Sequence, residues 1–455
     1  MLYGILKTMS VRELLSEDYI NEIRSVLGEE TEEFLKSYEE APRRSLRVNT
    51  LKGDTDDFLK LGLFGIREGD MVSFCPDGFY FEDDEAGKHP LHNAGAYYIQ
   101  EASAMSPVME LSPKPGERIL DLCASPGGKS TQIASFLKNR GILISNEING
   151  NRAKILSENI ERMGIANALV ISHDPLELPE HFESFFDRIL IDAPCSGEGM
   201  FRKNPEAIAE WSLENVRLCT ERQHYILNEA DKMLKAGGRL VYSTCTFNES
   251  EDEGSIETFL KEHPEYKLLK KHKIWPHKEK GEGHFLAVLT KGEEVITGAA
   301  DGAFPKGGFV TGVKNKDIAL FDEFAAENLK LDIRKIYGET EGKFIFFGDE
   351  LYIVPGDFPD MKGLKVLRSG LHLGTLKKNR FEPSHSLALF LKKGDAVRTS
   401  ELSKEEAINY LKGMTLNKEG EKGYHLLTHM GYSIGWGKLS GNIMKNHYPK
   451  GLRNF

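Results

Sequence analysis

The chain has 455 residues with a formal net charge of −11, and 40% of the residues are hydrophobic, which is enough apolar material for two to four domains. No apolar run approaches the roughly 20 residues that cross a bilayer, and the first residues lack a signal-peptide pattern, so we expect a globular cytoplasmic protein without a membrane partner. The five cysteines have no regular spacing, which argues against a disulfide framework and indicates reduced thiols.

Residues 1–95 are expected to form a small α/β appendage. A helix or two are expected before Arg43, and residues 13–40 hold ten acidic against two basic side chains. The segments RRSLRVNTLKG and VSFCPDGFYFE follow them. Met9 precedes a polar stretch and is an alternative start of the chain.

From about Glu110 the sequence alternates between strand and helix patterns. This alternation is typical of a parallel sheet with helices on both faces, and we assign it to a domain at 96–292. Ligands of such sheets lie outside the carboxyl ends of the strands, near the point where the strand order reverses. Strands are predicted at 117–122, 141–147, 168–174, 187–192 and 238–244, and helices at 129–137, 151–164 and about 211–234.

Glycines or carboxylates follow the first four of these strands. The first turn reads DLCASPGGKS, Asp121 to Ser130, and its glycines let the backbone approach a ligand closely. Glu147, Asp174 and Asp192 end the next three strands. Each carboxylate alone is more often a cap or a surface charge, but the series together predicts a cofactor slot.

The glycine turn departs from the pattern of dinucleotide sites. It has Pro126-Gly127-Gly128-Lys129 where such a site would have G-x-G-x-x-G. Glu147 is well placed for a ribose diol, which NAD and S-adenosylmethionine share, so Glu147 does not separate these two cofactors.

Two cysteines, Cys195 and Cys245, close the fourth and fifth strands. If these strands are neighbours they lie about 5 Å apart, and both thiols can face the same pocket. A nearby cation such as Lys129, Arg202 or Lys203 would raise the thiolate share of such a cysteine and so its nucleophilicity. The remaining cysteines are interpreted as small buried residues: Cys75, Cys123 and Cys219.

A second folded part is expected after a glycine-rich linker at 292–308. Short antiparallel strands are predicted within 343–355 and 364–383, and a helix at 403–411. We divide this part into a connecting α/β module at 309–370 and a last domain at 371–455. Residues 361–400 hold nine basic against two acidic side chains, which fits either a polyanion-binding surface or a solvated basic face.

The motifs DLCASPGGKS, DAPCSGEGMFRK, YSTCTFNESEDE and GAYYIQEASAM resemble those of RNA cytosine-C5 methyltransferases of the Sun/Fmu type. The chain end, GWGKLSGNIMKNHYPKGLR, and the segment GLHLGTLKKNRFEPSHSLAL are similar to the PUA-like region of the bacterial 16S rRNA enzymes of that family. The resemblance runs from about Arg47 to the end. It implies an α/β fold: a Rossmann-like S-adenosylmethionine-dependent methyltransferase sheet, a small N-terminal α/β appendage that binds RNA, and a C-terminal PUA-like α+β or β-barrel region that also binds RNA.

The resemblance also implies a covalent mechanism. Cys245 is implied to attack C6 of cytosine, C5 then takes the methyl group, and Cys195 helps the adduct to break down. Asp192 is implied to lie between cofactor and base, where a carboxylate can accept from the cytosine amino group, and Lys129 to lie beside it. The implied S-adenosylmethionine contacts are Cys123, Ala124, Ser125, Pro126, Gly127, Gly128 and Lys129 at the methionine end, Glu147 at the ribose, Asp174 at the adenine, and Asp192. Arg152 matches a basic position of the family after the ribose acid, although a surface role on a helix suits it equally.

The implied partner is 16S rRNA near the decoding site, as free rRNA or in the small subunit, bound by a monomer. Cytosine must leave its stack before attack. Candidate RNA contacts are Arg202 and Lys203 beside Cys195, and Lys377, Lys378, Arg380, Lys445 and Lys450 in the basic C-terminal part. The histidines lack zinc-site spacing, so no metal is expected. Three alternatives remain open: a tRNA methyltransferase, a non-catalytic RNA-binding ribosome assembly factor, and an NAD(P)-dependent oxidoreductase.

Overall fold

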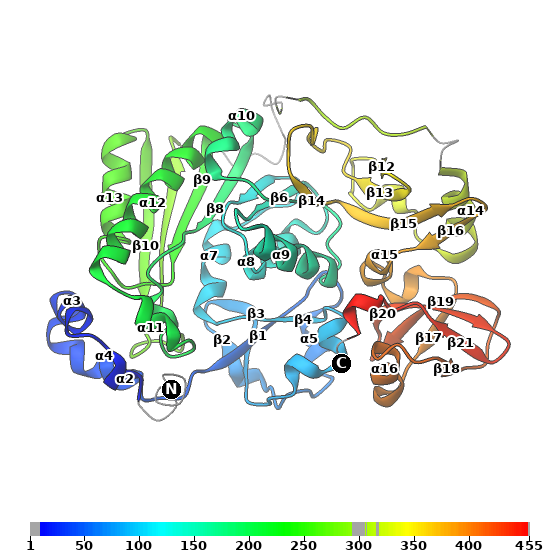
Figure 1. Ribbon diagram of the computed structural model, residues 1–455, viewed down its shortest axis with the longest axis horizontal. Coiled ribbons are helices and arrows are strands. Elements are labelled where there is room, and N and C mark those ends of the chain that lie inside the picture. The colour runs from blue at the N-terminus through cyan, green and yellow to red at the C-terminus, as the bar shows by residue number, and fades with distance from the viewer. Residues whose placement is uncertain (1–9, 294–304, 306, 315–317, 454–455) are drawn as a thin grey trace.

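The computed structural model describes residues 10–293, 305, 307–314 and 318–453 (Figure 1). Most of the predicted linker at 292–308, and the alternative start at Met9, lie outside the described residues. The described residues form four sheets with their covering helices. Among these residues no helix is long and apolar enough to cross a membrane.

An eight-stranded sheet forms the centre of the fold, with the strand order β10-β11-β9-β8-β5-β6-β7-β14. Its five central strands are parallel, so the predicted Rossmann-like α/β fold is confirmed. Antiparallel strands complete both edges, with β11 beside β9 and β14 beside β7. The strand bounds are Arg118–Asp121 (β5), Ile142–Asn146 (β6), Ala168–Ile171 (β7), Phe186–Asp192 (β8), Leu234–Thr244 (β9), Tyr266–Ile274 (β10), His284–Lys291 (β11) and Val366–Ser369 (β14).

Alternating side chains along these strands build one apolar layer on each face of the sheet, because successive residues point to opposite sides. Leu120 and Ile144 pack into a core with α10, α12 and α13. Ile119 and Leu143 pack into the opposite core with α7, α8 and α9. The helix bounds are Ser106–Leu111 (α7), Gly128–Leu137 (α8), Gly150–Arg162 (α9), Pro179–Phe182 (α10), Glu206–Glu210 (α11), Leu213–Met233 (α12) and Glu253–Glu262 (α13).

The strand order reverses between β5 and β8. The chain runs outward from β5 through β6 and β7, and then returns to the other side of β5 with β8 and β9. Open α/β sheets bind their ligands in the crevice at such a reversal, at the carboxyl ends of the strands. The strands β8 and β9 are neighbours, which is the condition for Cys195 and Cys245 to face the same pocket.

The N-terminal residues form an antiparallel sheet of order β2-β3-β1-β4 and a group of helices apart from it (Figure 1). Because β4 pairs with β1, this sheet extends past residue 95, the domain boundary expected from the sequence. Tyr19 and Phe34 of the helices pack against Phe201, Trp211 and Phe247, so they cover the loops that follow β8 and β9. The bounds are Val11–Leu14 (α2), Glu17–Leu27 (α3), Thr31–Ser37 (α4), Arg44–Val48 (β1), Thr55–Leu59 (α5), Met71–Val72 (β2), Cys75–Phe81 (β3), Pro90–Asn93 (α6) and Tyr97–Ile99 (β4).

Two sheets follow in the C-terminal part. The first has the order β12-β13-β15-β16 and runs across the predicted division at 370/371, because β15 pairs with β13. The last sheet has the order β17-β19-β20-β21-β18, and the helix predicted at 403–411 is α16. The bounds are Ala319–Asn328 (α14), Lys343–Phe347 (β12), Glu350–Val354 (β13), Leu371–Lys377 (β15), Arg380–Pro383 (β16), His385–Phe390 (α15), Thr399–Glu401 (β17), Lys404–Leu411 (α16), Leu416–Asn417 (β18), Gly423–His429 (β19), Tyr432–Ser440 (β20) and Ile443–Asn446 (β21).

The last sheet is packed against two other parts of the molecule. Trp436 of β20 shares a core with Phe324 of α14, and Tyr410 of α16 shares a core with Phe58 and Tyr97 of the N-terminal domain. These cores fix the C-terminal domain beside the N-terminal sheet.

Candidate active site

Cys195 and Cys245 meet at the carboxyl edge of the central sheet. Asp192 at the end of β8 pairs in register with Ser243 of β9, and each strand then turns into its cysteine. The two Sγ atoms lie 3.4 Å apart. The Cys245 thiol, together with burial, raises the pKa of Cys195 well above its usual value, so Cys195 is a neutral thiol at pH 7.

A buried carboxylate fixes the loop that carries Cys195. Glu251 is fully buried, and its Oε2 accepts hydrogen bonds from Ser196 N at 2.9 Å and Gln223 Nε2 at 2.9 Å. Gln223 Nε2 also donates to Pro194 O at 3.0 Å. Burial raises the pKa of Glu251 to about 7. Sequence reasoning missed Glu251 and Gln223, although Glu251 lies in the quoted segment YSTCTFNESEDE.

Lys129 and Asp192 form an ion pair beside the thiols. Lys129 Nζ lies 2.8 Å from Asp192 Oδ2, and Ser243 Oγ donates to Asp192 Oδ1 at 3.1 Å. Burial favours the neutral carboxyl, but Lys129 and His284 outweigh it and lower the pKa of Asp192. Asp192 is therefore an ionised acceptor at the edge of the pocket.

The glycine turn brings the start of α8 to the same edge. Gly127 has φ +112°, and a Cβ there would lie 3.1 Å from Leu156 Cδ1, so a side chain is disfavoured by backbone conformation and by space. Ser130 Oγ donates to Asp121 Oδ2 at 2.6 Å inside the turn. The turn is thereby tied to the end of β5.

A pocket of about 360 Å³ opens beside these groups, within the range of small-molecule sites. It brings together eight of the predicted residues: Cys123, Ser125, Glu147, Arg152, Asp174, Asp192, Cys195 and Cys245. Ala124, Pro126, Gly127, Gly128 and Lys129 do not line it; Lys129 acts on it through Asp192.

The carboxylates on the far side of the pocket are held in place. Glu147 is buried, accepts from Asn149 N at 2.9 Å, and lies 3.5 Å from Arg152 Nη2. Asp174 accepts from Tyr225 Oη at 3.2 Å. Tyr225 of α12 and the exposed Ile148 add apolar walls to the pocket. The sequence analysis did not identify them, because a tyrosine within a long helix belongs to no motif that marks a binding site.

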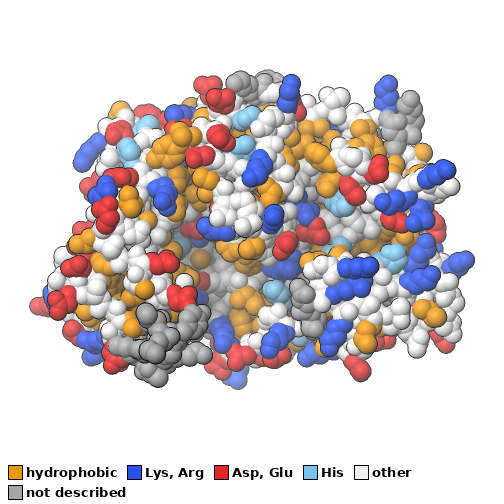
Figure 2. Space-filling view, viewed as in Figure 1, with side chains coloured by type: hydrophobic (Ala, Val, Ile, Leu, Met, Phe, Trp, Pro, Cys, Tyr) orange, Lys and Arg blue, Asp and Glu red, His pale blue; other side chains and the backbone are white. Residues whose placement is uncertain are grey.

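Arg202 does not face RNA, and this prediction is wrong. Its side chain is buried, with Nε 2.6 Å from Glu282 Oε2 and Nη1 donating to Ser37 O at 2.9 Å. The bond to Ser37 O ties α4 to the domain of the central sheet. The other six predicted RNA contacts are exposed, and in Figure 2 Lys and Arg side chains gather over the C-terminal part. They are Lys203, Lys377, Lys378, Arg380, Lys445 and Lys450.

One group of side chains has the spacing of metal ligands. Ligand atoms of Asp231, His263 and Glu265 lie within 4.8 Å of one another, away from the pocket. Lys291 Nζ already lies 2.8 Å from Asp231 Oδ1 and supplies a positive charge there. The absence of a metal stays a prediction.

Family models match four successive parts of the chain. The N-terminal domain of 16S rRNA methyltransferase RsmF matches 15–102, and 16S rRNA methyltransferase RsmB/F matches 108–290. The RsmF rRNA methyltransferase first C-terminal domain matches 323–391, and the methyltransferase RsmF PUA domain matches 397–454.

Curated relatives are similar to this chain over almost their whole length. The ribosomal RNA small subunit methyltransferase F of Shewanella loihica is 31% identical over 96% of this chain and 95% of its own length. The Vibrio cholerae protein of the same name is 30% identical over 96% of this chain and 97% of its own.

Solved structures are similar to about three fifths of the chain. A methyltransferase homolog from Pyrococcus horikoshii is 29% identical, with a TM-score of 0.56, over 62% of this chain and 97% of its own. NSun6 from the same organism, solved with SFG, has a TM-score of 0.56 over 62% of this chain and 100% of its own. At 24% identity, the NSun6 likeness shows the fold alone.

Proposed function

The chain belongs to the family of ribosomal RNA small subunit methyltransferases F, and on that premise we propose that it transfers the methyl group of S-adenosylmethionine to C5 of a cytosine in 16S rRNA. The observation that carries the proposal is the meeting of Cys195 and Cys245 at 3.4 Å beside the Lys129–Asp192 pair. A transfer to an exposed nitrogen or oxygen would need no such pair of thiols.

The pocket residues fit S-adenosylmethionine. The buried Glu147 presents a carboxylate suited to a ribose diol, and Asp174 with Tyr225 and Ile148 offers polar and apolar contacts suited to an adenine. Cys123 and Ser125 line the end nearest the thiols. The bound cofactor supplies a methyl group on a positively charged sulfur.

Cys245 makes the base reactive. C5 of cytosine is a poor nucleophile, so the Cys245 thiolate adds to C6, and the electron pair of the C5–C6 double bond becomes available at C5. Asp192 accepts a hydrogen bond from the amino group of the cytosine and so holds the ring over the thiol. Lys129 keeps Asp192 ionised for this contact.

Cys195 assists release. After methylation a solvent water accepts the C5 proton, the electron pair of the C5–H bond restores the C5–C6 double bond, and the bond from C6 to Cys245 breaks with its electrons on sulfur. Cys195 is a neutral thiol 3.4 Å from that sulfur, so it can donate a hydrogen bond to the departing thiolate. Loss of this donor would slow breakdown more than attack.

The test is methyl transfer itself. Wild-type protein is incubated with labelled S-adenosylmethionine and small-subunit rRNA, assembled small subunits or tRNA, and the nucleosides are then separated. We expect labelled 5-methylcytosine in 16S rRNA, at a position near the decoding site. Label in tRNA alone, or in another nucleoside, would refute the proposal.

A further inference from the structure

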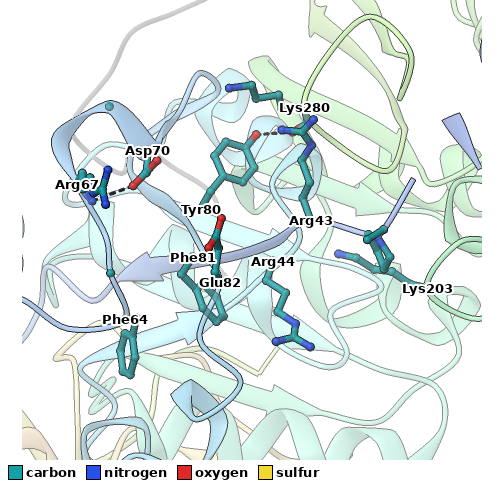
Figure 3. Close-up of a pocket in the computed structure, with 14 residues that line it drawn as sticks. Arg43, Arg44, Phe64, Arg67, Asp70, Tyr80, Phe81, Glu82, Lys203 and Lys280 are labelled. Atoms are coloured by element: carbon teal, nitrogen blue, oxygen red, sulfur yellow. Dashed lines mark hydrogen bonds between the residues drawn. The ribbon is translucent and has the colours of Figure 1, made fainter. Parts of the chain in front are cut away.

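A second, larger cleft lies between the N-terminal domain and the catalytic domain (Figure 3). Its volume is about 1040 Å³. One wall comes from the start of β1, the end of β3 and the loop around Arg67. The other wall comes from Lys203 and Lys280 of the catalytic domain, so side chains far apart in sequence share one surface.

The described residues that line this cleft carry a positive balance, although the whole chain is acidic. Five cations line it, against the two carboxylates Asp70 and Glu82. The cations are Arg43, Arg44, Arg67, Lys203 and Lys280, and Figure 3 shows them distributed around the cleft rather than converging on one point.

Several of these cations are available to a ligand. Arg44 pairs with Asp84, whereas Arg43 comes only within 4.0 Å of Glu40 and Lys203 within 3.9 Å of Glu282. The side chains of Arg67 and Lys280 are exposed and make no ion pair within the described part of the chain. Exposed cations without partners favour binding of a polyanion over an internal structural role.

The inner wall of the cleft is continuous with the thiol site. Gly199 N donates to Cys245 O at 2.8 Å, and Lys203 follows four residues later, within about 14 Å of extended chain. Lys280 precedes His284 by four residues, and His284 Nε2 lies 3.8 Å from Asp192 Oδ1. The two lysines therefore stand on segments that also build the active site.

The wall is also held rigid. Arg202, next to Lys203 in the chain, forms a buried ion pair with Glu282, two residues after Lys280, and Tyr80 Oη donates to Lys280 O. The half-buried ring of Tyr80 leaves an aromatic surface in the cleft on which a base can stack. Cations spread over several segments, with a ring among them, suit a nucleic acid strand better than a single phosphate.

We propose that this cleft holds the phosphates of the RNA strand next to the target cytosine and so guides that strand toward Cys245. The inference rests on the proposed function and deepens it, since it assigns the path of the substrate outside the catalytic pocket. Arg43, Arg67 and Lys280 are the phosphate contacts, and Lys203 is a further contact on the segment whose Gly199 N binds Cys245 O.

The test compares a triple variant of the cleft with a double variant elsewhere on the surface. The quantity compared is the salt dependence of RNA binding. Arg43→Gln, Arg67→Gln and Lys280→Gln are combined in one variant, and Lys261→Gln and Lys335→Gln, exposed and outside the cleft, in a control. Binding of a single-stranded 16S rRNA fragment is measured at several salt concentrations. Each lost phosphate contact lowers the slope of log affinity against log salt by about 0.7 for a single strand, so the cleft variant should lose about 2 from its slope.

We expect the control to keep the wild-type slope, and both variants to keep wild-type affinity for S-adenosylhomocysteine and wild-type melting temperature. A cleft variant with the wild-type slope, or a control that loses as much slope, overturns the proposal. The outcome is independent of the chemistry: failure of methyl transfer would refute the proposed function, whereas the binding slope would still report on the cleft.

Discussion

Cys195 Sγ and Cys245 Sγ lie 3.4 Å apart, each just beyond the end of one of two neighbouring parallel strands. The contact follows from the fold, because β8 and β9 are in register at Asp192 and Ser243 and both chains then turn toward the same pocket. Two thiols at this distance can act on one base in succession. This geometry motivates the predictions on catalysis.

Replacing Lys129 by Met should disable the reaction with little change in cofactor binding. The substitution removes the cation that opposes burial at Asp192, so the pKa of Asp192 rises and its hydrogen bond to the base weakens. We expect kcat to fall by about 10²-fold, the scale of loss when a substrate is held out of its reactive position. Steady-state methylation measures it, and the exposed Lys154→Met on α9 is the matched control. Equal rates for the two variants would contradict the role of the ion pair.

Glu147→Ala should weaken the binding of S-adenosylhomocysteine. Glu147 is a buried carboxylate on the pocket wall, and a hydrogen bond to a charged group contributes about 1.5–3 kcal/mol, so affinity should drop about tenfold or more. Calorimetric titration provides the measurement. Glu158→Ala, on the exposed face of α9, should bind like wild type. An unchanged dissociation constant for Glu147→Ala would remove this carboxylate from the cofactor site.

Glu251→Gln should change how stability depends on pH. Burial raises the pKa of Glu251 from 4.5 to about 7, so the folded chain binds this proton more tightly than the unfolded chain. The stabilising contribution is complete below about pH 4.5 and is lost as pH rises through about 7. Gln keeps an oxygen for Ser196 N and Gln223 Nε2 but has no proton to lose.

The melting temperature of Glu251→Gln relative to wild type should therefore rise between pH 5 and pH 8. Differential scanning calorimetry at the two values measures this difference, and other groups with raised pKa values, such as Asp121, cancel in the comparison. A constant difference across this range would show that Glu251 does not titrate as its burial requires. Glu253→Gln, at the partly exposed start of α13, is the control.

The central sheet was predictable from sequence because its signals are local. Apolar runs predicted β5 to β9, and Glu147, Asp174 and the two cysteines were singled out because they follow the carboxyl ends of those strands. All four line one pocket. β14 was predicted as a strand, but its place at the edge of this sheet was not, since pairing with β7 depends on a contact across about half the chain.

The error at Arg202 has the same physical origin. Its neighbours in sequence suggested an exposed basic loop, whereas its partner Glu282 lies 80 residues away and buries the guanidinium. Glu251 was missed because a carboxylate that holds a loop by its backbone has no motif of its own. The cleft lined by Arg43 and Lys280 exists only after two domains are packed together.

The most direct test of the account uses the two cysteines. Wild type, Cys195→Ala and Cys245→Ala are incubated with small-subunit rRNA and S-adenosylmethionine, and a denaturing gel then separates free protein from covalent protein–RNA adduct. We expect a denaturation-resistant adduct that accumulates only in Cys195→Ala, and neither adduct nor methylation in Cys245→Ala. An adduct in Cys245→Ala would reverse the two roles, and full methylation by both variants would contradict the covalent mechanism altogether.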